Sequence, residues 1–129
     1  MSRFNQRRGE VAERVAERRR REEAAPRLTE RVPKLESLKF DVQELRAGAI
    51  IPESTHVRRI PVPHAAALFE FPCLDSFCKD GGHDLTHSIL RQLESRATTF
   101  EVEDACGGQT GNASCQRVLR VVAHATYTS

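Results

Sequence analysis

Four cysteines are the residues whose type and spacing could most clearly do chemistry. They form two pairs, Cys73-x4-Cys78 and Cys106-x8-Cys115. Cysteine thiolates bind Zn²⁺ tetrahedrally, but neither pair has the C-x2-C spacing of a zinc ribbon, so the spacing alone does not identify a metal site. Both pairs lie in loop-forming stretches, FPCLDSFCKDGG and ACGGQTGNASC, and not in apolar runs. This setting favours metal ligands over thiols buried as small hydrophobic side chains.

The N-terminal stretch and the hydrophobicity of the chain predict the compartment of these thiols. The N-terminal stretch MSRFNQRRGEVAERV is basic and lacks the apolar segment of a secretory signal, and no run approaches the ~20 apolar residues of a membrane helix. We therefore expect a cytoplasmic protein without a membrane partner. In a reducing compartment cysteines bind metals more often than they form disulfides. The prediction is a structural zinc ion, with disulfides and unligated thiols as the alternatives.

One histidine is a reserve ligand. His83 follows Cys78 by five residues and would replace a cysteine that does not bind the metal. The stretch HDLTH (83–87) resembles the HExxH motif of zinc peptidases, but Asp84 is the expected N-cap, which places His83 outside the helix. His87 lies far from the apolar face of the helix and should therefore point to solvent. A thiol enzyme built on Cys78 and His83 would lose its nucleophile and its base to the metal. We expect a protein that is not an enzyme.

Hydrophobic periodicity predicts an α+β fold with one main helix. Alternation of apolar and polar residues indicates strands, and the spacing of Leu85, Ile89, Leu90 and Leu93 indicates a helix. A helical interpretation of the first strand also fits its apolar residues. The predicted order β-β-β-α-β-β comprises strands at 38–43, 56–62, 66–71, 98–104 and 117–127, with the helix at 84–96. The small, mostly antiparallel sheet should have an edge or broken strand at 56–62, because this stretch contains Pro61 and is followed by Pro63.

Placement of the cysteines on these elements predicts their convergence. If strands 66–71 and 98–104 are parallel neighbours joined by the crossover 74–97, Cys73 and Cys106 end at the same sheet edge. Cys115 begins an antiparallel return strand at that edge, and Cys78 is tethered to Cys73. The sequence therefore predicts a zinc knot at one edge of the sheet.

An arginine-rich arm precedes this domain. Residues 1–36 carry eleven Lys/Arg and seven Asp/Glu, whereas residues 37–129 carry nine and eleven. Strong helix formers predict a helix that ends near Pro26, although its thin apolar stripe would leave it fraying or partly disordered. We divide the chain into an arm and linker at 1–34 and a zinc-stabilised domain at 35–129. Candidate nucleic-acid contacts are Arg7, Arg8, Arg14, Arg18, Arg19, Arg20 and Arg21.

These observations predict a small, non-enzymatic zinc-binding module. Hydrophobic content is 39%, aromatic content is 5% and tryptophan is absent, so a modest core has reason to use a metal staple. Arginine makes bidentate phosphate contacts, which predicts nucleic acid or a ribonucleoprotein as the partner. The acidic residues interspersed in the arm weaken the positive electrostatic field that would attract phosphates. A protein-protein interaction module or regulatory adaptor is the alternative, and a metal- or thiol-dependent enzyme comes third.

Overall fold

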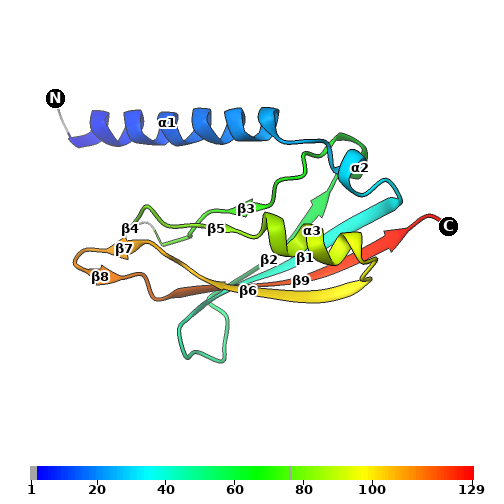
Figure 1. The fold of residues 1–129 in the computed structure, drawn as a ribbon. Helices are drawn as coiled ribbons and strands as arrows, with labels where there is room; N and C mark the ends of the chain where they lie inside the picture. Colours follow the sequence, from blue (N-terminus) through cyan, green and yellow to red (C-terminus); the bar gives the residue numbers. More distant parts are fainter. Residues whose placement is uncertain (1–2, 76) are drawn as a thin grey trace.

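The computed structural model describes residues 3–75 and 77–129, with side chains from residue 12 onward except residue 76 (Figure 1). Its main element is a four-stranded antiparallel sheet in the order β2-β1-β9-β6. Its strands are β1 (Leu35–Arg46), β2 (Ser54–Ile60), β6 (Thr99–Ala105) and β9 (Arg117–Tyr127). The α+β class and the antiparallel character of the sheet agree with the sequence prediction.

Alternating side chains explain why β1 is a strand and not the helix that its apolar residues also allow. Leu38, Phe40 and Val42 are buried on one face, and they pair across the sheet with Ala125, Ala123 and Val121 of β9. These small β9 side chains leave room for Phe40, which contacts Phe69 and Phe71 edge to face. Edge-to-face packing of aromatic rings adds to the burial of apolar area.

Shorter elements connect these long strands; some lie over one face of the sheet and others lie beyond its end (Figure 1). One two-stranded sheet pairs β3 with β5, and a three-stranded sheet has the order β4-β7-β8. The remaining strands are β3 (Glu70–Phe71), β4 (Cys78–Lys79), β5 (His83–Asp84), β7 (Gln109–Thr110) and β8 (Ala113–Ser114), and a 3-10 turn, η1, covers Val62–His64.

The predicted parallel pair of strands is wrong. Most of the expected strand 66–71 is not a strand, and its remnant β3 pairs antiparallel with β5 outside the main sheet. β6 pairs with β9 instead. Pairing with β9 joins β6 to a long neighbour through a short connection, whereas a parallel partner would need a crossover. The sheet edges are therefore β2, as expected, and β6.

Helix α3 (Thr86–Glu94) covers the sheet with the apolar face that its sequence predicts. Ile89, Leu90 and Leu93 are buried, and His87 is exposed. The helix begins two residues later than expected. Leu85 holds the N-cap position, while the Asp84 carboxylate accepts a hydrogen bond from the Thr86 amide at 3.1 Å.

The core extends into the segment 26–34 that we expected to be a linker. Helix α2 (Leu28–Arg31) buries Leu28 completely, and Val32 is 5% exposed. The Leu28 amide donates to the Ala65 carbonyl at 2.9 Å, and Arg27 forms a β-bridge with Ala66. In this structure the segment belongs to the packed domain.

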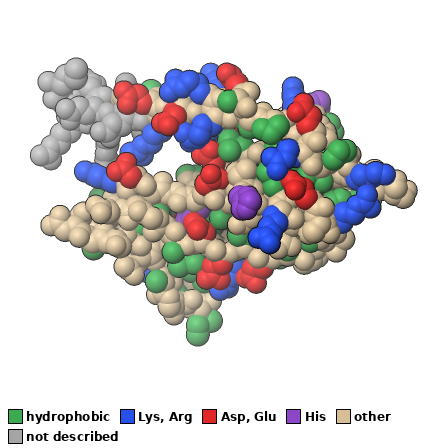
Figure 2. All heavy atoms as spheres, in the orientation of Figure 1, with side chains coloured by type: hydrophobic (Ala, Val, Ile, Leu, Met, Phe, Trp, Pro, Cys, Tyr) green, Lys and Arg blue, Asp and Glu red, His purple; other side chains and the backbone are tan. Residues whose placement is uncertain are grey.

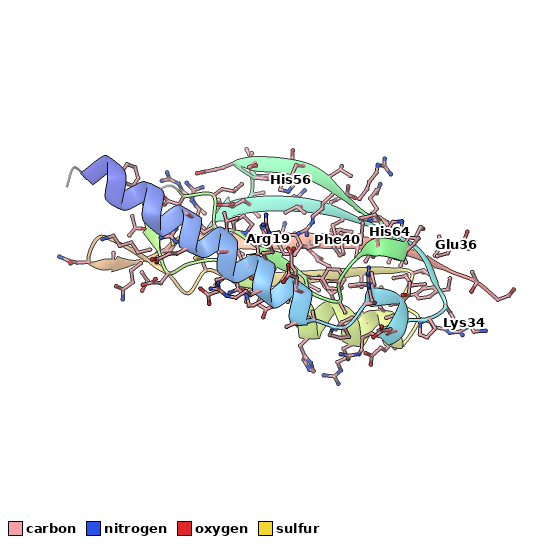
Figure 3. The ribbon with its side chains drawn as sticks, turned by 90° about the horizontal axis from the view of Figure 1, so that it is seen from above. Arg19, Lys34, Glu36, Phe40, His56 and His64 are labelled. Carbon is pink, nitrogen blue, oxygen red and sulfur yellow. The ribbon has the colours of Figure 1, made fainter. Side chains whose placement is uncertain are left out.

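Helix α1 (Arg3–Ala24) lies outside this core and runs across the domain (Figures 1 and 3). Acidic and basic side chains alternate along its visible face (Figure 2). Val15 is 54% exposed, so the helix has little apolar surface to bury. Among the described residues, no helix is long and apolar enough to cross a membrane.

Hydrophobic side chains are exposed at the tip of the loop between β1 and β2, which projects from the sheet (Figure 2). Ile50 is 92% and Ile51 is 80% exposed. The base of the loop is tied down, because the Ala47 amide donates to the Gln116 carbonyl and the Glu53 amide donates to the Glu44 carbonyl. The tip itself contributes nothing to the core.

Candidate metal centre

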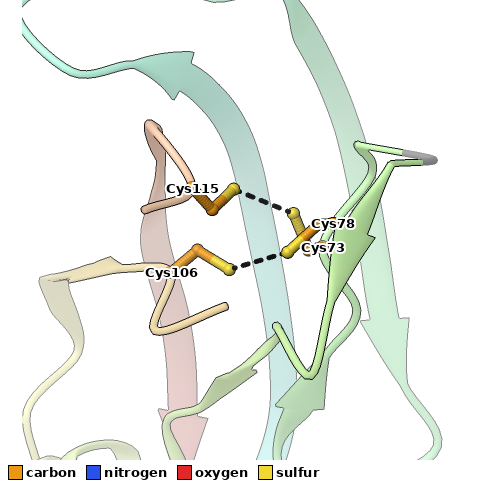
Figure 4. A group of neighbouring side chains, drawn as sticks. All are labelled: Cys73, Cys78, Cys106 and Cys115. Carbon is orange, nitrogen blue, oxygen red and sulfur yellow. Dashed lines mark hydrogen bonds between the residues drawn. The ribbon is translucent and has the colours of Figure 1, made fainter. Parts of the chain in front are cut away.

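The four cysteines lie together at one end of the molecule, two on each side of a small gap (Figure 4). Their sulfur atoms all lie within 4.8 Å of one another. The Sγ atoms of Cys73 and Cys115 are 3.8 Å apart, and those of Cys78 and Cys106 are 3.6 Å apart. Four sulfurs at about 2.3 Å from a tetrahedral Zn²⁺ would be separated by about 3.8 Å. The same distances are far longer than the ~2.05 Å S–S bond of a disulfide.

A tight loop after β3 delivers Cys73 and Cys78. Within it the Asp75 carbonyl accepts a hydrogen bond from the Cys78 amide at 3.1 Å, and the Asp75 carboxylate accepts one from the Phe77 amide at 2.9 Å. A carboxylate that accepts a hydrogen bond from the backbone amide two residues later is typical of a turn. The turn brings the two sulfurs to the same side of the chain. Cys78 then enters β4 and pairs with Thr110 of β7.

The ends of β6 and β9 deliver the other two cysteines. Cys106 follows β6 directly, and its amide donates to the Arg117 carbonyl at 2.9 Å. Cys115 precedes β9, and its amide donates to the Gly108 carbonyl at 2.9 Å. Because β6 and β9 are antiparallel neighbours, the end of one lies beside the start of the other. The antiparallel pair β6 and β9 therefore brings Cys106 and Cys115 together, and the parallel crossover that we predicted is not needed.

Two glycines allow the backbone to approach the sulfurs closely. A Cβ atom on Gly81 would lie 2.6 Å from Cys106 Sγ and would also collide with Cys78 Sγ. A Cβ atom on Gly108 would collide with Cys78 Sγ and lie 2.6 Å from the Lys79 carbonyl oxygen. Only residues without a side chain fit at these two positions.

Backbone amides stabilise the thiolate of Cys106. The Gly82 and Gly108 amides each donate to its Sγ at 3.4 Å. Burial by itself raises the pKa of the Cys106 thiol, but these amides from Gly108 and Gly82 lower it, and the net shift of the pKa is downward. Backbone amides commonly donate hydrogen bonds to the sulfur ligands of a metal centre and orient them.

The pKa values of Cys73 and Cys78 move in the other direction. Burial, with smaller contributions from the neighbouring thiols, raises the pKa of Cys73 well above its usual value and that of Cys78 to about 11. Without a cation these two groups hold their protons at neutral pH. Crowded thiols divide in this way, with the pKa of Cys106 lowered and those of Cys73 and Cys78 raised, when no cation neutralises their charge.

His83 lies outside this group of sulfurs. Its side chain is fully buried, and Nδ1 lies 2.8 Å from an Asp104 carboxylate oxygen of β6. Nε2 is buried and has no hydrogen-bond partner among the described residues. The bond to Asp104 ties β5 to β6 beside the cysteines. The only sequence signal for the contact between His83 and Asp104 was the position of Asp104 at the end of the predicted strand 98–104.

An ionic network that the sequence analysis missed joins the cysteine loop to the sheet. Arg117 of β9 donates a hydrogen bond to Glu53, and its Nε lies 3.8 Å from the buried carboxylate of Glu44 and 3.9 Å from that of Asp75. The hydrogen bond from Arg117 lowers the pKa of Glu53, despite an opposing effect of burial. A glutamate at an apolar position of β1 was the available signal, because a buried carboxylate needs a cation nearby.

The arginines of α1 are distributed between ion pairs and solvent. Arg21 makes a bidentate contact with Glu70, at 2.8 Å for both bonds, and Arg18 lies 3.2 Å from Glu22. The side chains of Arg14, Arg19 and Arg20 have no carboxylate within 4.0 Å among the described residues. The side chains of Arg7 and Arg8 lie outside the described part. The structure therefore leaves part of the predicted set available to a partner.

Comparisons with family models, curated proteins and solved structures found no match.

Proposed function

We propose that this chain is a non-enzymatic module whose fold is stabilised by one structural Zn²⁺, and that its arginines contact nucleic acid. The convergence of four cysteine sulfurs within 4.8 Å carries the first part of this proposal. These sulfurs come from two distant parts of the chain, 73–78 and 106–115, so one ion would join them at the end of the sheet.

The donor set favours a structural role for the ion. Four thiolates fill a tetrahedral zinc site, whereas a catalytic zinc keeps one position for water or substrate. No vacant position remains for His83, whose ring is bound to Asp104 at 2.8 Å. The large apolar side chains of the cysteine loop are not packed into the core, since Leu74 and Phe77 are 53% and 70% exposed. Metal binding would stabilise this end of the domain, where apolar packing contributes little.

Nucleic-acid binding is supported by the chemistry and exposure of the arm. Arg14, Arg19 and Arg20 are exposed on a helix that stands clear of the core. Guanidinium groups bind phosphate oxygens through paired hydrogen bonds. The ion pairs of Arg18 and Arg21 reduce the charge available, so binding should depend on the remaining arginines and be moderate in strength.

Metal content together with thiol titration tests the zinc site. We expect one Zn²⁺ per purified chain, four unreactive thiols before chelation and four reactive thiols after it. Loss of the metal should also lower the unfolding temperature, because metal that binds only the folded chain adds its binding free energy to stability. Four thiols that react fully in the untreated protein, with no metal, would overturn the zinc proposal.

The salt dependence of binding tests the nucleic-acid part. Affinity for an oligonucleotide should fall steeply between 50 and 200 mM salt, because displaced counterions drive phosphate binding. Replacing Arg18–Arg21 by glutamine should remove most of the affinity. Binding that is insensitive to salt and survives these substitutions would instead favour the protein-interaction alternative.

A further inference from the structure

A basic groove runs between the C-terminal part of α1 and the edge strand β2. Its volume is about 690 Å³. Residues from four segments line it: α1, the connection from α1 to α2 with Ala25 and Arg27, β2, and the stretch from Pro61 to Phe69. Its charged lining is Arg19, Arg27, Arg58, Arg59 and His64 against Glu22 and Glu23. Figure 3 shows Arg19 on α1 and His64 on η1.

A second groove beside α1 carries more acidic residues. It extends from α1 to the cysteine loop, and its lining includes Arg14, Arg18 and Arg21 against four carboxylates. One of these carboxylates is Glu70, which binds Arg21. Arg21 and Arg18 of that groove therefore have partners within the chain, Glu70 and Glu22, whereas Arg14 has no carboxylate within 4.0 Å among the described residues. The second groove is the more acidic of the two.

The cations of the basic groove form no direct ion pairs with the side chains that the structure describes. Among the described side chains, no carboxylate lies within 4.0 Å of Arg19, Arg27 or Arg58. Arg27 donates to the His64 carbonyl at 3.4 Å. Glu22, which lines the same groove, is occupied by Arg18.

Arg58 is the most constrained of these cations. Its guanidinium lies 5.1 Å from the centre of the Phe71 ring and donates to the Glu70 carbonyl at 3.2 Å. Burial lowers the pKa of Arg58, the charge of Arg18 lowers it further, and the charge of Glu22 opposes both effects. A rigid, partly desolvated guanidinium gains more from an incoming anion than a solvated one does.

We propose that the groove between α1 and β2 binds phosphates of a nucleic-acid backbone, with Arg19, Arg27 and Arg58 as the contacting cations. This inference rests on the proposed nucleic-acid function and extends the contact surface beyond the arm. The apolar floor of the groove, which includes Ile60, Pro61 and Leu68, offers no exposed aromatic ring for base stacking. Recognition would therefore be of the backbone and independent of sequence.

Oligonucleotide binding by groove variants tests the inference. The probe is a fluorescently labelled single-stranded 15-mer, and its anisotropy is followed between 50 and 200 mM salt with the zinc-loaded, full-length chain. Arg27→Gln with Arg58→Gln should weaken binding and reduce the slope of log K against log salt by about 1.4, since each phosphate contact on a single strand contributes about 0.7. The matched control, Lys34→Gln with Arg91→Gln, removes two exposed charges elsewhere and should retain the wild-type slope.

A second variant protects the test against loss of folding. Arg58 packs on Phe71, so its replacement could destabilise the domain. Arg27→Glu changes an exposed side chain only, and should weaken binding more than the control does. A polyglutamate peptide of 15 residues is the competing probe, and equal affinity for this peptide would overturn selectivity for phosphate.

The outcomes separate the groove from the arm. If both groove variants bind like the control while Arg14→Gln with Arg20→Gln weakens binding, the groove inference is wrong and the arm proposal stands. If the wild-type chain binds without salt dependence, both are wrong. A reduced slope in the groove variants with an unchanged control establishes the groove.

Discussion

The backbones of Gly81 and Gly108 meet beneath the cysteine cluster, where a Cβ atom on Gly108 would stand 2.6 Å from the Gly81 Cα atom. One glycine follows the Cys73–Cys78 loop and the other follows Cys106. Their contact brings the two pairs of sulfurs together. The cysteine cluster therefore depends on residues that offer no ligand atom.

Gly108→Ala should disrupt this contact, because the added methyl group meets backbone atoms that cannot move independently. We expect a loss of about 1–3 kcal/mol in the free energy of unfolding, as for other overpacked sites, together with weaker zinc binding. Chemical denaturation and metal competition measure the two effects.

Gly107→Ala is the matched control for that substitution. A Cβ atom on Gly107 meets nothing within 4 Å. Its stability should stay within about 0.5 kcal/mol of the wild type. Equal stability of the two variants would show that the Gly81–Gly108 contact is dispensable.

Replacing single candidate ligands should separate the cysteines from His83. Cys115→Ser should lose or greatly weaken the metal, whereas His83→Asn should retain one ion per chain bound by four thiolates. Cobalt substitution reports this directly, since the visible spectrum of Co²⁺ depends on the number of sulfur ligands. His83→Asn should still cost about 1–3 kcal/mol, because it leaves the Asp104 contact incomplete. A spectrum that changes in His83→Asn would make the histidine a ligand.

Zinc affinity should rise with pH. The raised pKa values of Cys73 and Cys78, the latter about 11, mean that both thiols are protonated in the metal-free protein at pH 7. Zinc must displace these protons, so lower pH disfavours the metal-bound state and higher pH favours it. Competition titrations between pH 6 and 8 measure the slope, and proton release measured by calorimetry checks it. An affinity that does not vary over this range would contradict thiol ligation.

The pair Arg21–Glu70 should determine how firmly α1 is held. It is a bidentate contact from the arm to the domain, and Glu70→Gln removes its charge. We expect faster amide exchange across residues 12–24 with little change in global stability, because exposed ion pairs contribute little to the free energy of unfolding. Hydrogen-exchange mass spectrometry measures amide exchange both in α1 and in the rest of the domain. Glu36→Gln, an exposed carboxylate without an ion-pair partner among the described residues, is the control, and identical exchange in the two variants would show that α1 is held otherwise.

Local pattern was sufficient to locate the long elements. Alternation in 38–43 and 117–127 predicted β1 and β9, and apolar spacing predicted α3 within two residues at each end. Alternation and helical periodicity are properties of a few neighbouring residues, so they can be read without knowing what the elements pack against. The strand at 66–71 failed because its apolar residues pack into the core as an irregular segment, with Phe69 buried against Phe40.

The amino-acid sequence by itself determined the types of group available: four thiols in loop-forming stretches, an arginine-rich helix, and strands of alternating polarity. Only the tertiary structure decided which strands are neighbours, that Gly81 and Gly108 touch, that His83 binds Asp104, and that Arg27 and Arg58 share a groove with Arg19. The physical reason is that strand pairing and groove formation depend on contacts between residues far apart in the chain. Such contacts are selected by the packing of the whole domain, and no short window of residues contains them.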